Sequence, residues 1–140
     1  MSKNIVITGA SKGIGKKIAD YLCEFKNYNV INVSRSKNKN SKIKNYPCDI
    51  SNYNEVKKIF KKIRKIDVLI NNSAITRFSS NHVINFDKII KTNLNGLFYC
   101  SYEATKFLKK SKQSCIINIS SINAYQAFTN NPAYVSSKGA

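Results

Sequence analysis

The chain has 140 residues, the length of one domain at the usual ~100–200 residues per domain. Because 42% of its residues are hydrophobic and only two are proline, it is not a disordered or low-complexity protein. No apolar stretch approaches the ~20 residues of a membrane span, and the N-terminus lacks the pattern of a signal peptide, so we expect a cytoplasmic protein with no membrane partner.

The formal net charge of +17 points to polyanions as one class of partner. Lysines gather at 37–44, 57–65 and 106–112. The chain nevertheless lacks the aromatic interleaving and the zinc-ligand spacing of common nucleic-acid-binding modules. Two of the three segments also fall where the solvated side or end of a helix is expected. We therefore expect no specific nucleic-acid partner.

The cysteines do not form a metal-binding pattern. Cys23, Cys48, Cys100 and Cys115 are scattered without CxxC or CxH spacing, and the single histidine, His82, has no carboxylate or thiol close to it in the sequence. We expect reduced, mostly structural thiols and no metal site.

Apolar runs alternate with helical patterns along the chain, which is typical of a parallel sheet with crossover helices. Strands are expected at 4–8, 29–33, 43–48, 67–71 and 115–119. Helices are expected at 14–25, at 52–65 with Ser51 as the N-cap, at 86–110, and from Pro132 onward. The polar segment 34–45 has no helical pattern. The predicted fold is a three-layer α/β domain with a Rossmann-type, doubly wound parallel sheet.

Two of these helices carry apolar stripes. Residues 14, 18, 22 and 25 fit one packed face of the first helix. The apolar residues expected on one broad stripe of the third helix are Phe86, Ile89, Ile90, Leu94, Leu97, Phe98 and Leu108.

A glycine-rich turn, Thr8-Gly9-Ala10-Ser11-Lys12-Gly13-Ile14-Gly15, lies between the first strand and the first helix. Glycine reaches positive φ and lets a phosphate approach the backbone, while the following helix offers unpaired N–H groups and the positive end of its dipole. The G-x3-G-x-G spacing differs from the general G-x-G-x-x-G dinucleotide pattern. An ordinary glycine turn remains the alternative.

Near the end of the chain, Tyr134 and Lys138 are four residues apart and so lie on one face of a helix. An ammonium one turn from a phenol favours the phenolate, which makes the tyrosine a better acid–base group at neutral pH. Ser121 follows the apolar run at 115–119, where a strand ends and a ligand cleft begins. A solvated helix face is the alternative for an isolated Tyr-x3-Lys pair.

Together these motifs resemble those of the short-chain dehydrogenase/reductase family. The turn at 8–15 is similar to the family's T-G-x3-G-x-G, the segment 71–74 to its N-N-A-G with Ser73-Ala74 in place of Ala-Gly, and 93–98 to its N-x-x-G-x-F. Asn118-Ile119-Ser120-Ser121 and Tyr134-x3-Lys138 complete the series. The five motifs occur in the family's order and cover the whole chain.

The resemblance implies a role for four catalytic residues. Tyr134 protonates the carbonyl oxygen as hydride arrives from the nicotinamide, and Lys138 makes that phenol more acidic and holds the nicotinamide ribose. Ser121 orients and polarises the carbonyl, with Ser120 as its competitor. Asn93 resembles the residue that anchors a water in the proton relay, although a polar residue tolerated on a helix is the alternative.

The turn and the resemblance also imply a set of cofactor-binding residues. Asp49 and Ile50 resemble the pair that contacts adenine, with a simple loop acid as the alternative for Asp49, and Asn72 resembles a residue that lines the adenine ribose. The full expected set is Gly9, Ser11, Lys12, Gly13, Ile14, Gly15, Ser34, Arg35, Asp49, Ile50, Asn72, Tyr134 and Lys138.

The end of the second expected strand favours NADP(H) over NAD(H). An acid at this place accepts from the ribose 2′-OH of NAD, whereas an arginine accommodates the 2′-phosphate of NADP. This chain has Ser34-Arg35, together with Lys12 in the glycine turn. Arginine is the stronger indicator because its planar guanidinium matches a phosphate.

The resemblance therefore implies an NADPH-dependent oxidoreductase acting on a carbonyl or secondary alcohol, similar to 3-oxoacyl-carrier-protein reductases or sugar-modifying reductases. Its partners would be a small-molecule substrate, or an acyl-carrier thioester, and further copies of itself in a homodimer or homotetramer. One alternative is a nucleotide-binding protein of this fold without turnover. The other is an inactive fragment truncated at the C-terminus, because family members are longer: their further strands, cofactor-closing loop and most of the substrate pocket are missing, which leaves the fifth strand with an unpaired edge.

Overall fold

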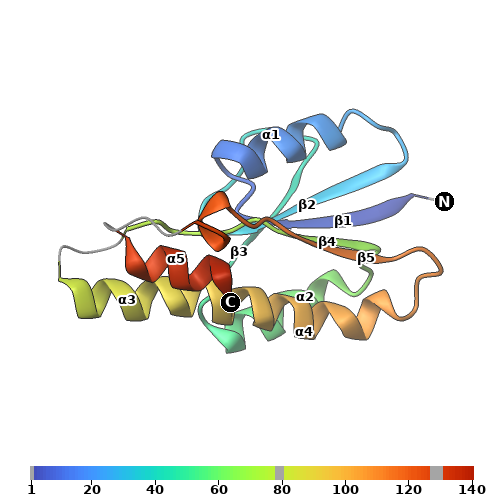
Figure 1. The fold of residues 1–140 in the computed structure, drawn as a ribbon. Coiled ribbons are helices and arrows are strands. Elements are labelled where there is room, and N and C mark those ends of the chain that lie inside the picture. Colours follow the sequence, from blue (N-terminus) through green and yellow to red (C-terminus); the bar gives the residue numbers. More distant parts are fainter. Residues whose placement is uncertain (1, 78–80, 127–130) are drawn as a thin grey trace.

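The computed structural model describes residues 2–77, 81–126 and 131–140, which form a five-stranded sheet flanked by helices (Figure 1). The strands are β1 (Lys3–Thr8), β2 (Tyr28–Ser34), β3 (Lys44–Pro47), β4 (Val68–Asn71) and β5 (Cys115–Asn118). The helices are α1 (Gly13–Leu22), α2 (Tyr53–Ile63), α3 (His82–Ile90), α4 (Gly96–Leu108) and α5 (Pro132–Gly139). A π-helical turn (Lys91–Asn95) joins α3 to α4, and a 3₁₀ turn (Ile122–Ala124) follows β5.

All strand pairs are parallel, and the strand order is β3-β2-β1-β4-β5. The chain builds outward from β1 to β3 on one side and then returns to place β4 and β5 on the other. Helix α1 covers one face of the sheet, whereas α2, α3 and α4 cover the opposite face (Figure 1). The predicted α/β fold with a doubly wound parallel sheet is confirmed. In such sheets the crevice for a ligand opens where the strand order reverses, here between β1 and β4.

The central strands are buried on both faces, as their continuous apolar sequence predicts. Successive side chains of a strand point to opposite faces, so Ile5 and Ile7 pack toward α1 while Val6 packs toward α2 and α4. The buried cluster on the α1 side is Ile5, Ile7, Ala10, Ala19, Val30, Ile43 and Ile70. The larger cluster on the other side includes Val6, Ile31, Val33, Val56, Phe60, Leu69, Cys100 and Ala104.

The first two helices differ from the prediction at their ends. Helix α1 ends at Leu22, and only Ile18 and Leu22 of its expected stripe pack against the core, since Ile14 and Phe25 are 66% and 41% exposed. Asn52, not Ser51, is the N-cap of α2, and its side chain accepts hydrogen bonds from the N–H groups of Asn54 and Glu55. The Ser51 prediction is wrong because this hydroxyl donates to Asp49 Oδ1 at 2.7 Å.

The long third helix is present but begins earlier than predicted. It runs from His82 to Leu108 through the π-helical turn, and Asn81 caps its first turn by accepting from the N–H of Ile84 at 3.1 Å. The prediction that Phe86 and Phe98 belong to one packed apolar stripe is wrong, because their side chains are 42% and 59% exposed. A π-helical turn adds a residue, so positions on either side of it no longer share the face that an unbroken 3.6-residue period predicts.

One other expectation is confirmed. The segment 35–43 contains no helix and joins β2 directly to β3. In the described part of the chain, β5 pairs only with β4, and all four of its residues are exposed. No helix among the described residues is both long enough and apolar enough to cross a membrane.

Candidate active site

A cleft of about 370 Å³ lies beyond the carboxyl ends of β1, β2 and β4. Its volume is within the ~300–1,000 Å³ typical of small-molecule sites. Ten of the residues predicted to bind the cofactor line it: Gly9, Ser11, Lys12, Gly13, Ile14, Ser34, Arg35, Asp49, Ile50 and Asn72. The lining residues that sequence reasoning missed are Ser36, Cys48, Ser73, Ala74, Ile75, Lys88 and Thr92.

Some of the missed residues carried a signal in the sequence. Ser73 and Ala74 directly follow Asn72 in a recognised motif, and Thr92 precedes Asn93. Lys88 had none, because a helical pattern does not show which of its polar positions faces a cleft built from other strands.

The glycine-rich turn adopts the backbone that its sequence predicts. Gly9 and Gly13 have φ of +70° and +58°, the left-handed region that favours glycine. Gly15 does not line the cleft; it is buried, and a Cβ on it would lie 2.2 Å from Asn72 Nδ2 and 2.6 Å from the Gly9 carbonyl oxygen. It therefore allows the turn to pack closely against the segment after β4.

That segment holds the turn through hydrogen bonds. The Thr8 hydroxyl accepts from the N–H groups of Asn72 and Ser73, both at 3.0 Å, and the Asn72 amide donates to the carbonyls of Thr8 and Gly9 at 3.0 and 3.2 Å. Ser73, which stands where the family pattern has alanine, packs against Gly9. Asn72 thus shapes the turn besides lining the cleft.

The start of α1 faces the cleft with its amino end. Its N-cap residue, Lys12, makes no side-chain capping hydrogen bond. The first N–H groups of a helix have no partner within the helix, so they can donate to an anion together with the positive end of the dipole. The geometry suits a phosphate.

Asp49 lines the opposite side of the cleft. Burial by itself would raise the pKa of this carboxyl, but two hydrogen bonds from Ser51, at 2.7 and 3.0 Å, and the nearby cations of Lys88 and Arg35 outweigh it and leave the pKa below its usual value. Asp49 is therefore an ionised acceptor at neutral pH.

Asn93 lies in the π-helical turn and is 4% exposed. Its Oδ1 accepts from the N–H of Ile75 at 2.9 Å, and its Nδ2 donates to the Ile75 carbonyl at 3.0 Å and to Ser137 Oγ at 2.9 Å. Both N–H groups of the amide are thus used within the protein. The side chain joins α5 to Ile75, a residue of the cleft wall.

Tyr134 and Lys138 lie one turn apart on α5, as predicted. Asn131 caps the helix by accepting from the N–H of Tyr134, and Pro132 occupies its first turn. Lys138 Nζ lies 5.9 Å from the ring centroid of Tyr134 and donates to the Ile119 carbonyl at 2.7 Å. Burial lowers the pKa of this lysine.

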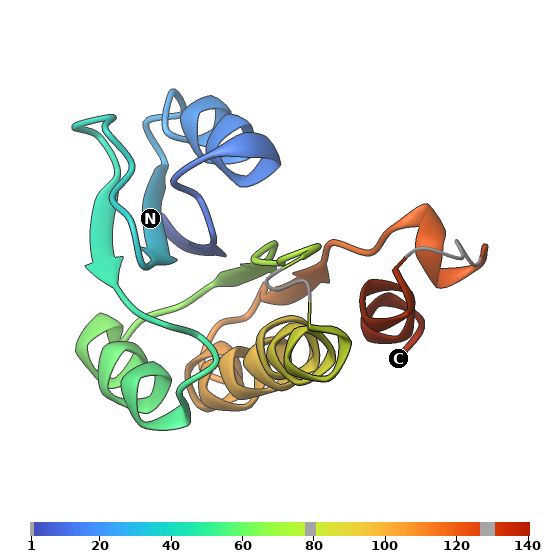
Figure 2. The same ribbon diagram turned by 90° about the vertical axis from the view of Figure 1, so that its left-hand side faces the viewer.

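Ser121 forms the start of the 3₁₀ turn, which packs against α5. Its hydroxyl accepts from the N–H of Asn123 at 3.2 Å. None of the four predicted catalytic residues lines the cleft itself. They lie at the side where α5 runs next to α3 (Figure 2).

The cysteines and acids do not form a metal centre in the part of the chain that the structure describes. All four cysteines are free thiols, with Cys48 and Cys100 buried and Cys115 exposed on β5. Burial raises the pKa of the Cys48 thiol to about 12, so it is not a reactive nucleophile.

The family model of the short chain dehydrogenases matches residues 3–140. The chain belongs to this family. The family name denotes dehydrogenases, and the turn, the cleft and the Tyr134-x3-Lys138 pair agree with an oxidoreductase that uses a nicotinamide cofactor.

Three proteins illustrate what the chain is similar to. The 3-oxoacyl-[acyl-carrier-protein] reductase of Staphylococcus aureus is 32% identical over 87% of this chain. ElxO, in a structure of a substituted form with NADPH bound, is 31% identical over 99% of this chain, with a TM-score of 0.87. A 4-hydroxyisoleucine dehydrogenase complexed with NADH and succinate is 31% identical over 96% of it, with a TM-score of 0.86.

The chain spans part of each relative's length: 57% of the S. aureus reductase, 63% of ElxO and 66% of the 4-hydroxyisoleucine dehydrogenase. The two solved structures contain different nicotinamide cofactors, so membership of the family does not by itself choose between them.

Proposed function

We propose that this chain is the cofactor-binding and catalytic part of an NADPH-dependent oxidoreductase that interconverts a carbonyl and a secondary alcohol. The observation that carries the proposal is the adjacency of two groups. A glycine-rich turn opens the cleft at the carboxyl ends of β1 and β4, and Asn93 ties the wall of that cleft to the helix that holds Tyr134 and Lys138.

The nicotinamide, when bound, supplies or accepts the hydride. The protein must then deliver a proton to the carbonyl oxygen, and Tyr134 is the group we assign to this step. The ammonium of Lys138 lies 5.9 Å from the ring centroid of Tyr134, one turn along α5, and we assign it to the ribose of the nicotinamide. Ser121, at the start of the 3₁₀ turn beside α5, would donate a hydrogen bond to the same oxygen.

The preference for NADPH rests on two exposed cations. Arg35 follows β2 and Lys12 precedes α1, and both line the same cleft. A 2′-phosphate on the adenine ribose would meet both side chains, with the arginine able to form two parallel hydrogen bonds. Asp49, the acid in this cleft, follows β3 rather than β2, and we assign it to the adenine.

For the substrate, the S. aureus relative suggests a 3-oxoacyl thioester. The test is NADPH consumption by the protein expressed from the longest reading frame that contains this chain, with 3-oxoacyl thioesters and simple ketones as substrates. We expect turnover that Tyr134→Phe abolishes, while NADPH binding, followed by fluorescence, persists. Tight binding without turnover on any carbonyl would instead favour a non-catalytic nucleotide-binding protein.

We also propose that the protein associates with copies of itself through the outer face of α3 and α4. Large apolar side chains are exposed there: Val83, Ile84, Phe86, Phe98 and Tyr102. The rings of Phe98 and Tyr102 stack with their centroids 6.0 Å apart. Large apolar side chains that are exposed together mark interaction surfaces. Light scattering after size exclusion should show a dimer or tetramer, and Phe98→Ser should shift it toward monomer; a monomeric native protein would refute the proposal.

A further inference from the structure

A network of asparagine side chains occupies the place where the predicted fold commonly has a helix, between β2 and β3. Its members are Asn32 on β2, Asn38 and Asn40 in the segment 35–43, and Asn45 on β3. Asn32 and Asn38 are 1% and 3% exposed. Buried amides are costly unless they are hydrogen-bonded, so such a network needs partners for nearly all of its groups.

One side of the network holds the glycine-rich turn. Asn32 Oδ1 accepts from the N–H of Ala10 at 3.0 Å, and Asn38 Nδ2 donates to the Ala10 carbonyl at 2.8 Å. Ala10 is fully buried and directly precedes Ser11 and Lys12. Both polar groups of its main chain are therefore fixed by side chains from β2 and from the segment after it.

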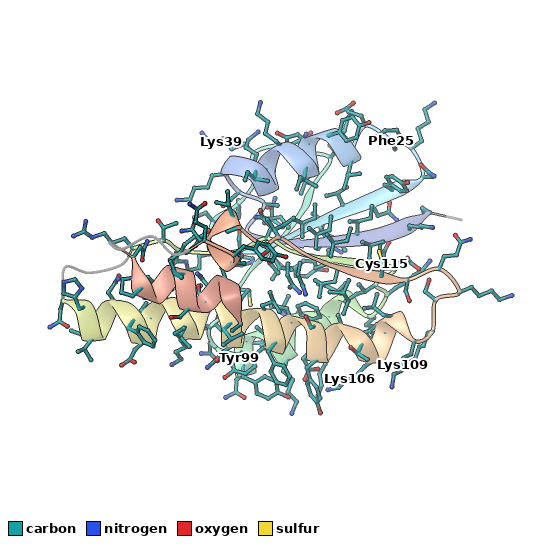
Figure 3. All side chains as sticks on the ribbon, in the orientation of Figure 1. Phe25, Lys39, Tyr99, Lys106, Lys109 and Cys115 are labelled. Carbon is teal, nitrogen blue, oxygen red and sulfur yellow. The ribbon has the colours of Figure 1, made fainter. Side chains whose placement is uncertain are left out.

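The other side of the network holds the segment that carries Arg35. Asn32 Nδ2 donates to the Ser36 carbonyl at 3.2 Å, and the Ser34 hydroxyl donates to the same carbonyl at 2.6 Å. Hydrogen bonds thus hold the chain at Ser34 and at Ser36, the two neighbours of Arg35. In Figure 3 the segment runs beside α1, where Lys39 is labelled.

Asn45 connects Asn32 to Asn38 through hydrogen bonds. Its Oδ1 accepts from Asn32 Nδ2 at 2.8 Å and from the N–H of Asn38 at 2.7 Å. Its Nδ2 donates to the carbonyls of Asn38 and Ile43, both at 3.1 Å. A displacement of the segment 35–43 would therefore break hydrogen bonds to the glycine-rich turn as well.

We infer that Asn32 and Asn38 are positioning residues for 2′-phosphate recognition, because they set the spacing between Lys12 and Arg35. Neither side chain lines the cleft, so neither touches the cofactor. This inference rests on the proposed preference for NADPH. Bidentate contacts between a guanidinium and a phosphate require the supporting backbone to be held within about 0.5 Å, and the network supplies that support.

A purely structural network would give a different result. Loss of a buried amide would then loosen the glycine-rich turn and weaken the binding of every adenine nucleotide to the same degree. If the network positions Arg35 and Lys12, its loss weakens the binding of ligands with a 2′-phosphate more than that of ligands without one. The ratio of the two affinities separates the two roles.

The experiment titrates the full chain with adenosine 2′,5′-bisphosphate and with adenosine 5′-monophosphate by calorimetry. In the native protein we expect the bisphosphate to bind at least about tenfold more tightly, and Arg35→Ala to remove that preference. Asn38→Ala should lower the preference several-fold while binding of the monophosphate changes little. Asn29→Ala is the matched control, because Asn29 lies on the same strand at its exposed, opposite end and its side chain donates to Ser2 and Asn4, far from the glycine-rich turn.

A double variant makes the test specific. If Asn38 acts through Arg35, Asn38→Ala should cost little further preference once Arg35 is alanine, so the two changes are not additive. Asn38→Ser keeps a short polar side chain and serves if the alanine variant does not fold. Equal weakening of both nucleotides by these variants, or full additivity with Arg35→Ala, would overturn the inference. A native protein without any preference for the bisphosphate would instead refute the proposed cofactor.

Discussion

The two halves of the predicted active site are supported in different ways. The glycine-rich turn follows β1 and packs against the segment after β4, and both of these strands are central and buried. Three of the predicted catalytic residues follow β5, which is an edge strand among the described residues and has all four of its residues exposed: Ser121 begins the 3₁₀ turn, and Tyr134 and Lys138 lie on α5, a helix of eight residues. Helix α5 is joined to the rest by side-chain hydrogen bonds from Asn93 to Ser137 and from Lys138 to Ile119.

Because of this difference, we expect nucleotide binding to depend on the packing of the core and catalysis to depend on contacts outside it. Central parallel strands are covered on both faces, so the turn that follows them is fixed by the packing of the whole domain. An exposed edge strand contributes little buried apolar surface. The geometry of Tyr134 and Lys138 therefore depends on the packing of α5 against α3 and on a few identifiable hydrogen bonds. We expect substitutions in those hydrogen bonds to separate nucleotide binding from catalysis.

The largest expected effect is a loss of stability when a buried side chain of the core is removed. Phe60 is fully buried between α2 and the sheet, and Phe60→Ala should lower the free energy of unfolding by about 3–5 kcal/mol. Urea denaturation followed by circular dichroism measures this. Phe25→Ala is the control of the same chemistry at a position that is 41% exposed, and an equal loss of stability for both variants would contradict the burial of Phe60.

A smaller effect is expected at the glycine-rich turn. Gly9 has φ of +70°, and a Cβ there would lie 2.7 Å from Ser73 Oγ, so Gly9→Ala should cost about 1–3 kcal/mol of stability. It should also weaken the binding of adenosine 5′-monophosphate, because the added Cβ pushes the turn away from Ser73. Ser73→Ala removes the clashing hydroxyl, so recovery of binding in the double variant would sharpen the assignment, and undiminished binding by Gly9→Ala would contradict it.

The catalytic half should lose activity without losing nucleotide binding. Ser137→Ala removes the hydroxyl that accepts from Asn93 and donates to the Tyr134 carbonyl. We expect kcat to fall about tenfold, a barrier increase of about 1.4 kcal/mol, with an unchanged Kd for NADPH. Ser137→Thr keeps the hydroxyl and should retain most of the rate. A parallel loss of NADPH binding would show that the two halves are not separable.

The smallest expected effect is a change in the pH dependence of stability, caused by Glu103, which lies outside the cleft. Burial alone would raise the pKa of Glu103, but its hydrogen bonds with Lys106 (2.8 and 2.9 Å) and Tyr53 (2.8 Å) hold that pKa below its usual value. Helix α4 carries Lys106 on the side away from the sheet (Figure 3).

The sign of this effect follows from the lowered pKa. A carboxyl whose folded pKa is depressed contributes stability above the unfolded pKa of about 4.3, and that contribution is lost as the pH falls through the folded pKa. The stability difference between native protein and Glu103→Gln should therefore shrink below about pH 4. Urea midpoints at pH 7 and in acid measure it, Tyr53→Phe should reproduce only part of the difference, and a constant difference would contradict the ion pair.

Much of the fold follows from local patterns. Apolar runs alternating with helical patterns placed all five strands within about one residue of their observed ends, and the polar composition of 34–45 indicated little or no helix there. The errors lie where a local pattern has two solutions. Ser51 and Asn52 are both good caps, and the choice fell to Asn52 because Asp49 engages the Ser51 hydroxyl.

The sequence by itself determined the types of element, the glycine-rich turn and the placement of Tyr134 and Lys138 on one helix face, because periodicity and the conformational range of glycine act between neighbours in the chain. Only the tertiary structure decided which distant groups meet. Asn93 and Ser137 are 44 residues apart, and Asn38 and Ala10 are 28 apart. Their hydrogen bonds exist because the strand order reverses at β1 and because the chain between β2 and β3 folds back over the turn, which no local pattern specifies.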